Sequence, residues 1–154
     1  MCGIALGVWH HEDTQPRDAW ASVISQIQRR GHDAYHSVAC TQDGTRWELH
    51  ASVLCLRGKE LTPQPITSQD GHLHLAWNGQ IFSSEHEDDS LLDMERNDGA
   101  IIMTRLEEHA DQIPDVLVST LSAVDGPYAF VLVDTRNACI YYGRDPLGRR
   151  SLLH

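Results

Sequence analysis

The sequence predicts a mixed α+β fold in which two stacked β-sheets carry helices on their outer faces. The predicted elements run in the order strand, helix, several antiparallel strands, two helices and a last pair of strands, without the regular alternation of βαβ proteins. The strand predicted at residues 128–134 has almost no polar positions, so both of its faces need cover. A second sheet on one face and helices on the other supply that cover.

The first half of the chain supplies one strand, one helix and a hairpin. An apolar run at residues 4–9 predicts a buried strand with Cys2 at its tip. Apolar residues at three- and four-residue spacing between residues 16 and 30 predict a helix that ends before Gly31. Strands are predicted near residues 37–41 and 47–56, and the Asp43-Gly44 pair between them is typical of a hairpin turn.

The second half supplies the other sheet and two helices. Short strands are predicted at residues 66–67 and 73–77, and Asn78-Gly79 predicts a tight turn before a further strand at 80–82. Residues 83–98 are polar and acidic, which predicts a mobile surface loop. Helices are expected at 100–109 and 114–124, followed by a hairpin of strands at 128–134 and 138–143.

The composition is that of one globular domain covering residues 1–154. A hydrophobic share of 41% and a charged share of 22% argue against both wholesale disorder and a membrane protein. No apolar stretch is long enough for a transmembrane helix. The start of the chain lacks the basic region of a secretory signal, so the expected location is cytoplasmic or nuclear.

Charge and ligand-type residues exclude several kinds of partner. A net charge of −10 argues against binding to a nucleic-acid backbone. The cysteines form no Cys-x-x-Cys pair, and Cys40, Cys55 and Cys139 lie in or beside apolar runs, so we expect them to be buried thiols. His72 and His74 alternate along a strand and suggest a two-ligand metal site, but surface histidines are the favoured interpretation. No metal or cofactor is therefore expected.

Cys2 is the residue with the most chemical interest. Removal of Met1 would place a thiol and a free α-amino group on one residue. The α-amino group has an ordinary pKa of about 7.7 to 8.0, so its neutral form can accept the thiol proton near physiological pH. The alternative is that Cys2 is a buried apolar residue on a first strand.

Short motifs along the chain occur in an order that resembles a known family. They are Met1-Cys2-Gly3-Ile4, Arg30-Gly31-His32-Asp33, Asn78-Gly79-Gln80-Ile81-Phe82, Asn97-Asp98, Asp125-Gly126-Pro127-Tyr128-Ala129-Phe130 and Gly143-Arg144-Asp145-Pro146-Leu147-Gly148. Together they resemble the class II glutamine amidotransferase domain of the N-terminal-nucleophile hydrolases. The resemblance is greatest to the amino-terminal part of asparagine synthetases and of asparagine synthetase domain-containing proteins, and it covers nearly the whole chain.

The resemblance implies a four-layer α/β/β/α sandwich of two mostly antiparallel sheets, with further strands and an ATP-using synthetase domain beyond this segment. It implies hydrolysis of L-glutamine to glutamate and ammonia, which would pass to a synthetase domain or a partner chain. Cys2 would be the nucleophile, and Asn78 and Gly79 would stabilise the oxyanion. The chain has no phosphate-binding glycine loop of its own, so no ATP chemistry is assigned to it.

The resemblance also implies substrate-binding residues. Asp98 matches the aspartate that binds the glutamine amine, with a helix N-cap as the alternative role. Arg30 matches an arginine beside the nucleophile, and it also suits a helix C-terminus. Gln80 stands where the family has a glutamate after Asn-Gly.

Three positions depart from the family in ways that bear on glutamine binding: Leu54, Gln80, and His32 in place of a loop proline. Leu54 replaces the arginine that clamps the substrate carboxylate, and Arg57, three residues on, is the candidate substitute, although this spacing points it to the other face of a strand. A different class of function therefore remains open: a degenerate amidotransferase-like domain that serves as a binding or interaction module.

Overall fold

The computed structural model describes residues 2–10, 17–55, 60–84 and 96–153. Within these ranges, one sheet is three-stranded and antiparallel, in the order β1-β3-β2. Its strands are β1 (Gly3–His10), β2 (Ala34–Gln42) and β3 (Thr45–Val53). The β2-β3 turn is formed by Asp43 and Gly44, whose φ angles of 49° and 77° confirm the predicted hairpin. The helix α1 (Arg17–Gln28) lies between β1 and β2 in the chain.

The second sheet is four-stranded and antiparallel, in the order β4-β5-β8-β9. Its strands are β4 (Ile66–Thr67), β5 (Leu73–Gly79), β8 (Tyr128–Asp134) and β9 (Cys139–Arg144). Two helices, α2 (Asp98–Glu108) and α3 (Ile113–Ser122), are separated by the short 3-10 helix η2 (Ala110–Gln112). The strands β6 (Ser83–Ser84) and β7 (Val124–Asp125) form a small separate pair. These elements confirm the α+β class.

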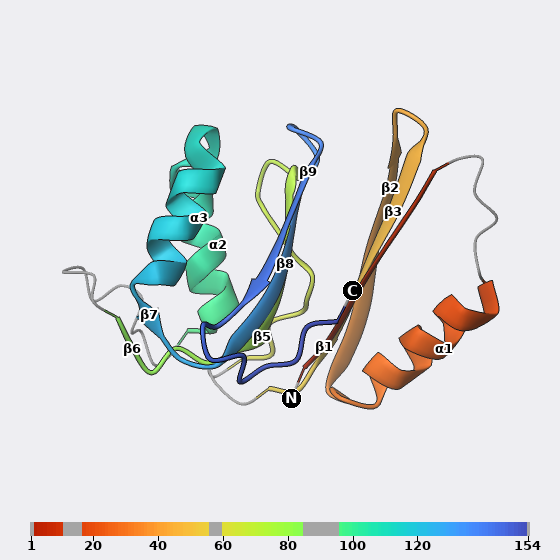
Figure 1. The fold of residues 1–154 in the computed structure, drawn as a ribbon, viewed down its shortest axis with the longest axis horizontal. Helices are drawn as coiled ribbons and strands as arrows, with labels where there is room; N and C mark the ends of the chain where they lie inside the picture. Colours follow the sequence, from red (N-terminus) through yellow and green to blue (C-terminus); the bar gives the residue numbers. More distant parts are fainter. Residues whose placement is uncertain (1, 11–16, 56–59, 85–95, 154) are drawn as a thin grey trace.

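Apolar packing holds the elements together in two cores. Figure 1 shows α1 on the outer side of the three-stranded sheet and α2 and α3 on the outer side of the four-stranded sheet. All seven residues of β8 are buried. Val131 and Val133 pack toward Trp47 and Leu49 of the facing sheet, whereas Phe130 and Leu132 belong to the core beneath α2 and α3. The prediction that this strand needs cover on both faces is confirmed.

Several local predictions were wrong. Asn78 and Gly79 do not form a tight turn, because β5 continues through them and pairs them with Ala129 and Tyr128 of β8. Residues 80–82 are not part of a strand. Cys55, expected to be buried, is exposed because it lies beyond the end of β3.

The predicted acidic loop at residues 83–98 is only partly described. Ser83 and Ser84 form β6, Asp98 begins α2, and residues 85–95 lie outside the described ranges. Every helix within the described ranges is too short or too polar to cross a membrane.

Candidate active site

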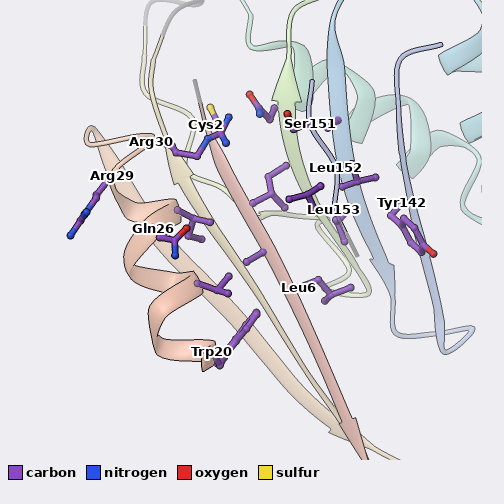
Figure 2. A pocket seen from close by; sticks show the side chains of 17 residues that line it. Cys2, Leu6, Trp20, Gln26, Arg29, Arg30, Tyr142, Ser151, Leu152 and Leu153 are labelled. Atoms are coloured by element: carbon purple, nitrogen blue, oxygen red, sulfur yellow. The ribbon is translucent and has the colours of Figure 1, made fainter. Parts of the chain in front are cut away.

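A cavity of about 850 Å³ runs along β1, the edge strand of the three-stranded sheet. Its lining includes Cys2, Arg30 and Asn78, which lie far apart in the sequence and which the motifs had singled out. Figure 2 shows Cys2 and Arg30 at one end of this cavity and Trp20 toward the other. Much of the remaining wall is apolar, with contributions from β1, α1 and β8. The structure therefore brings three predicted site residues to the wall of a single cavity.

Cys2 lies immediately before β1 and is half-buried, as its predicted place at a strand tip requires. Its Sγ lies 3.8 Å from the carbonyl oxygen of Leu54, the residue that follows β3. The next residue is fixed more firmly, because the Gly3 N–H donates to Ser52 Oγ at 3.1 Å and Ser52 in turn donates to the Ile27 carbonyl oxygen at 2.5 Å. The buried hydroxyl of Ser52 thereby ties the start of β1 to the last turn of α1.

Arg30 is held against the same end of β3 by the turn that follows α1. Its N–H donates to the Ile27 carbonyl oxygen at 3.0 Å. The neighbouring Gly31 packs so closely that an added Cβ would lie 2.5 Å from the carbonyl carbon of Val53. Two residues further on, Asp33 accepts a hydrogen bond from the Cys55 N–H at 2.8 Å. This clamp places Arg30 on the cavity wall.

Asn78 and Gly79 form the last two positions of β5. In an antiparallel ladder, hydrogen-bonded pairs alternate with pairs whose backbone groups point the other way. The Gln80 N–H donates to the Pro127 carbonyl oxygen at 3.0 Å, so the Gly79 N–H points away from β8. A Cβ at Gly79 would lie 2.6 Å from the Cβ of Tyr128. Only glycine therefore fits this position without a shift of the backbone.

Asp98 lies beside the residues that follow this strand end. It is 3% exposed, and its Oδ2 accepts a hydrogen bond from the Ile81 N–H at 3.0 Å, one residue after Gln80. The alternative role as a helix N-cap is wrong, because Asn97 is the N-cap of α2 and accepts from the Gly99 N–H at 3.0 Å. A carboxylate in the first turn of α2 is also stabilised by the helix dipole.

The structure does not gather every predicted residue on the cavity wall. Gly79, Gln80 and Asp98 are not among the described residues that line it, although they adjoin Asn78. Arg57 lies outside the described residues.

Sequence reasoning missed part of the wall. Tyr142 of β9 and the segment Ser151–Leu153 line the same cavity as Cys2. Figure 1 shows the last residues of the chain crossing from the four-stranded sheet toward the three-stranded one. No local signal in the sequence indicates this crossing, because it depends on contacts between distant elements.

The two histidines of the suggested metal site have separate partners. His72 Nδ1 lies 3.2 Å from Thr135 Oγ1, and His74 Nδ1 lies 3.1 Å from Thr67 Oγ1. Burial, and secondarily the proximity of His72, lowers the pKa of His74. Among the residues that the structure describes, no three ligand-type side chains form a group that would hold a metal ion.

Comparisons with known proteins agree with the motifs. Residues 1–154 match the glutamine amidotransferase domain family. The chain is 33% identical to the asparagine synthetase domain-containing protein 1 of Bos taurus over 153 residues, which is 99% of this chain and 22% of that protein. It is 30% identical over 152 residues to the asparagine synthetase [glutamine-hydrolyzing] of Asparagus officinalis, covering 96% of this chain and 24% of that protein.

The chain thus spans about a quarter or less of the length of these relatives. Since the family match extends over all 154 residues, this chain belongs to the glutamine amidotransferase domain family.

Proposed function

We propose that this domain hydrolyses L-glutamine to glutamate and ammonia, with Cys2 as the nucleophile. The observation that carries the proposal is the shared cavity wall of Cys2, Arg30 and Asn78. The family supports the reaction, since a glutamine amidotransferase domain takes nitrogen from glutamine. The proposed fold is correspondingly the four-layer α/β/β/α sandwich of the N-terminal-nucleophile hydrolases.

The proposed reaction begins after removal of Met1. The freed α-amino group of Cys2 accepts the thiol proton, and Sγ attacks the side-chain amide carbon of glutamine to form a tetrahedral oxyanion. The C–N bond then breaks as the same amine returns the proton to the departing nitrogen, which leaves as ammonia. Water attacks the remaining thioester and releases glutamate and the free thiol.

The end of β5 is proposed to stabilise the oxyanion. The Gly79 N–H is not used by the ladder with β8, so its direction suits a donor to a bound oxygen. The side-chain amide of Asn78, on the cavity wall, is the second proposed donor. Loss of one such donor typically costs about 2.7 to 4 kcal/mol of transition-state stabilisation.

The charged ends of glutamine need partners of opposite charge. We assign the α-carboxylate to Arg30, which is on the cavity wall, with Arg57 as a further candidate. We assign the α-ammonium group to Asp98 and Gln80, which adjoin the end of β5.

We further propose that the ammonia serves an asparagine-type synthesis, carried out by a synthetase domain or a partner chain in the cytoplasm. Relatives named as asparagine synthetases are about four times as long as this segment, which leaves room for such a domain in those proteins.

The test is labelling with 6-diazo-5-oxo-L-norleucine, a glutamine-mimicking electrophile, followed by intact mass spectrometry. We expect one adduct on the processed chain, loss of the adduct in Cys2→Ala, and retention in Cys55→Ala, which removes an exposed thiol near the same strand end. Ammonia release from L-glutamine should follow the same pattern. A retained Met1, or an adduct that is independent of Cys2, would contradict the mechanism and favour the binding-module alternative.

A further inference from the structure

Asp145 is a buried carboxylate that holds two separate segments of the chain. It is 2% exposed. Its Oδ2 accepts hydrogen bonds from the backbone N–H groups of Tyr128 and Arg150, each at 3.3 Å. Its Oδ1 accepts from the backbone N–H of Arg149 at 3.1 Å and from the Nε of the same residue at 3.2 Å.

The first of the two segments supports the end of β5. Tyr128 is the residue opposite Gly79 in the β5–β8 ladder, and the Asp145 N–H donates to the Tyr128 carbonyl oxygen at 2.9 Å. Asp145 therefore binds Tyr128 through both its backbone and its side chain. Gly79 and Tyr128 pack too closely to admit a Cβ on Gly79. A displacement of Tyr128 is therefore transmitted directly to Gly79.

The second segment forms part of the Cys2 cavity. After Arg149 and Arg150, the chain continues into Ser151 and Leu152, which line the same cavity as Cys2. The guanidinium of Arg149 also lies 3.3 Å from Asp125 Oδ1, next to the start of β8. The carboxylate thus joins the support of β5 to the wall that faces the nucleophile.

The charge of Asp145 makes these contacts strong. Burial alone would raise its pKa, but the hydrogen bonds from Arg149, Arg150 and Tyr128 outweigh burial and hold the pKa at about 2. The group is therefore ionised at neutral pH, and its hydrogen bonds are charge-assisted.

We propose that Asp145 is a positioning residue of the Cys2 site: by fixing both segments, it holds Gly79 at the distance from the nucleophile that the oxyanion requires. The inference rests on the proposed function. It predicts that loss of the carboxylate weakens stabilisation of the transition state more than binding of glutamine.

The test compares Asp145→Asn with Asp134→Asn. Asp134, the last residue of β8, is a matched control. Like Asp145, it is buried and accepts hydrogen bonds from backbone N–H groups, here those of Arg136 and Asn137. It lies at the end of β8 opposite to Tyr128, about 20 Å from that residue. We expect Asp145→Asn to lower kcat about 10- to 100-fold with KM for glutamine within about 2-fold, as for a small misplacement of catalytic groups. Asp134→Asn should leave both constants within about 2-fold of the wild type.

Amide hydrogen exchange supplies a readout that does not depend on turnover. Asp145→Asn should speed exchange at residues 79–81 and 149–153, whereas Asp134→Asn should speed it at residues 135–139. If Asp145→Asn does not fold, Arg149→Ala is the milder variant, since it keeps the carboxylate and its backbone donors. We expect from it a smaller fall in kcat, again without a matching change in KM.

The outcomes separate the two proposals. An active wild type combined with unchanged kcat in Asp145→Asn, or in Arg149→Ala where that variant is needed, would overturn the positioning role alone. Equal losses of kcat in Asp145→Asn and Asp134→Asn would also overturn it, because they would indicate a general effect of stability. A wild type that neither hydrolyses glutamine nor is labelled at Cys2 would overturn the proposed function and the role that rests on it.

Discussion

The Gly3 N–H donates a hydrogen bond to the buried hydroxyl of Ser52 at 3.1 Å. The Ser52 hydroxyl itself donates a hydrogen bond to the Ile27 carbonyl oxygen, so one side chain joins β1, β3 and α1. Cys2 precedes Gly3, and Arg30 follows Ile27 by three residues. The geometry between the proposed nucleophile and the arginine beside it therefore depends on this hydroxyl.

Ser52→Ala should destabilise the domain and loosen the Cys2 site. The substitution leaves the Gly3 N–H and the Ile27 carbonyl without their buried partner, which typically costs about 1 to 3 kcal/mol. We expect a lower free energy of unfolding in urea and slower labelling of Cys2. Ser119→Ala is the control, since its hydroxyl is exposed and donates within one turn of α3. Equal labelling rates in wild type and Ser52→Ala would refute the link.

Gly79→Ala should impair activity more than stability alone explains. The new Cβ would meet Tyr128 Cβ at 2.6 Å and the Pro127 carbonyl oxygen at 2.9 Å, so the end of β5 must move. Overpacking of this kind costs about 1 to 3 kcal/mol. A donor displaced from the oxyanion should reduce kcat by about 100-fold.

Gly143→Ala is the matched control for that experiment. It adds a Cβ to β9 of the same sheet, where the nearest atom is Cε1 of the Phe130 ring at 3.0 Å. We expect nearly normal kcat from this variant. If Gly79→Ala and Gly143→Ala lost activity in proportion to their loss of stability, the special position of Gly79 would be disproved.

The elements that local pattern determines were predictable from the sequence. The Asp43-Gly44 turn formed as expected because both residues adopt the positive φ angles that this pair tolerates. Periodic apolar residues located α1, α2 and α3 to within a few residues. The place of Cys2 before β1 followed from the apolar run beside it.

The features that depend on distant contacts were not predictable in the same way. Asn78-Gly79 is a turn signal locally, but pairing with Ala129 and Tyr128, about fifty residues later, extends the strand through it. Aspartate is a residue type that often forms a helix N-cap, yet Asn97 takes that role while Asp98 accepts a hydrogen bond from the Ile81 N–H. Tertiary contacts override such short signals because they bury more groups than one turn does.

The buried carboxylate of Asp145 should make stability depend on acid. Its pKa is lowered from 3.8 to about 2 by hydrogen bonds that outweigh burial. A group with a depressed folded-state pKa stabilises the protein above its unfolded value and loses that contribution as the pH falls. The wild type should therefore lose its stability advantage over Asp145→Asn between pH 3.8 and about 2. Urea unfolding of both proteins across this range is the measurement, and a constant difference would contradict the assignment.

Trp20 and Glu48 should be energetically coupled in a pH-dependent way. The Trp20 Nε1–H, on the helix that borders the cavity, donates to Glu48 Oε2 at 3.0 Å. Burial would raise the pKa of Glu48, but hydrogen bonds from Arg46, Trp20 and His50 lower it below 4.5. The carboxylate is therefore ionised at neutral pH, and its contribution to stability is lost as the pH falls through its lowered pKa.

A double-mutant cycle with Trp20→Phe and Glu48→Gln measures this coupling directly. Phenylalanine keeps the aromatic contact with Trp9, whose ring centroid is 5.3 Å away, and removes the N–H donor. We expect a coupling free energy of about 1 kcal/mol at neutral pH, since the pair is charge-assisted but partly exposed. The coupling should decline in acid as Glu48 takes up a proton. A coupling that is absent at neutral pH, or that is unchanged in acid, would show that the indole is held by packing rather than by the carboxylate.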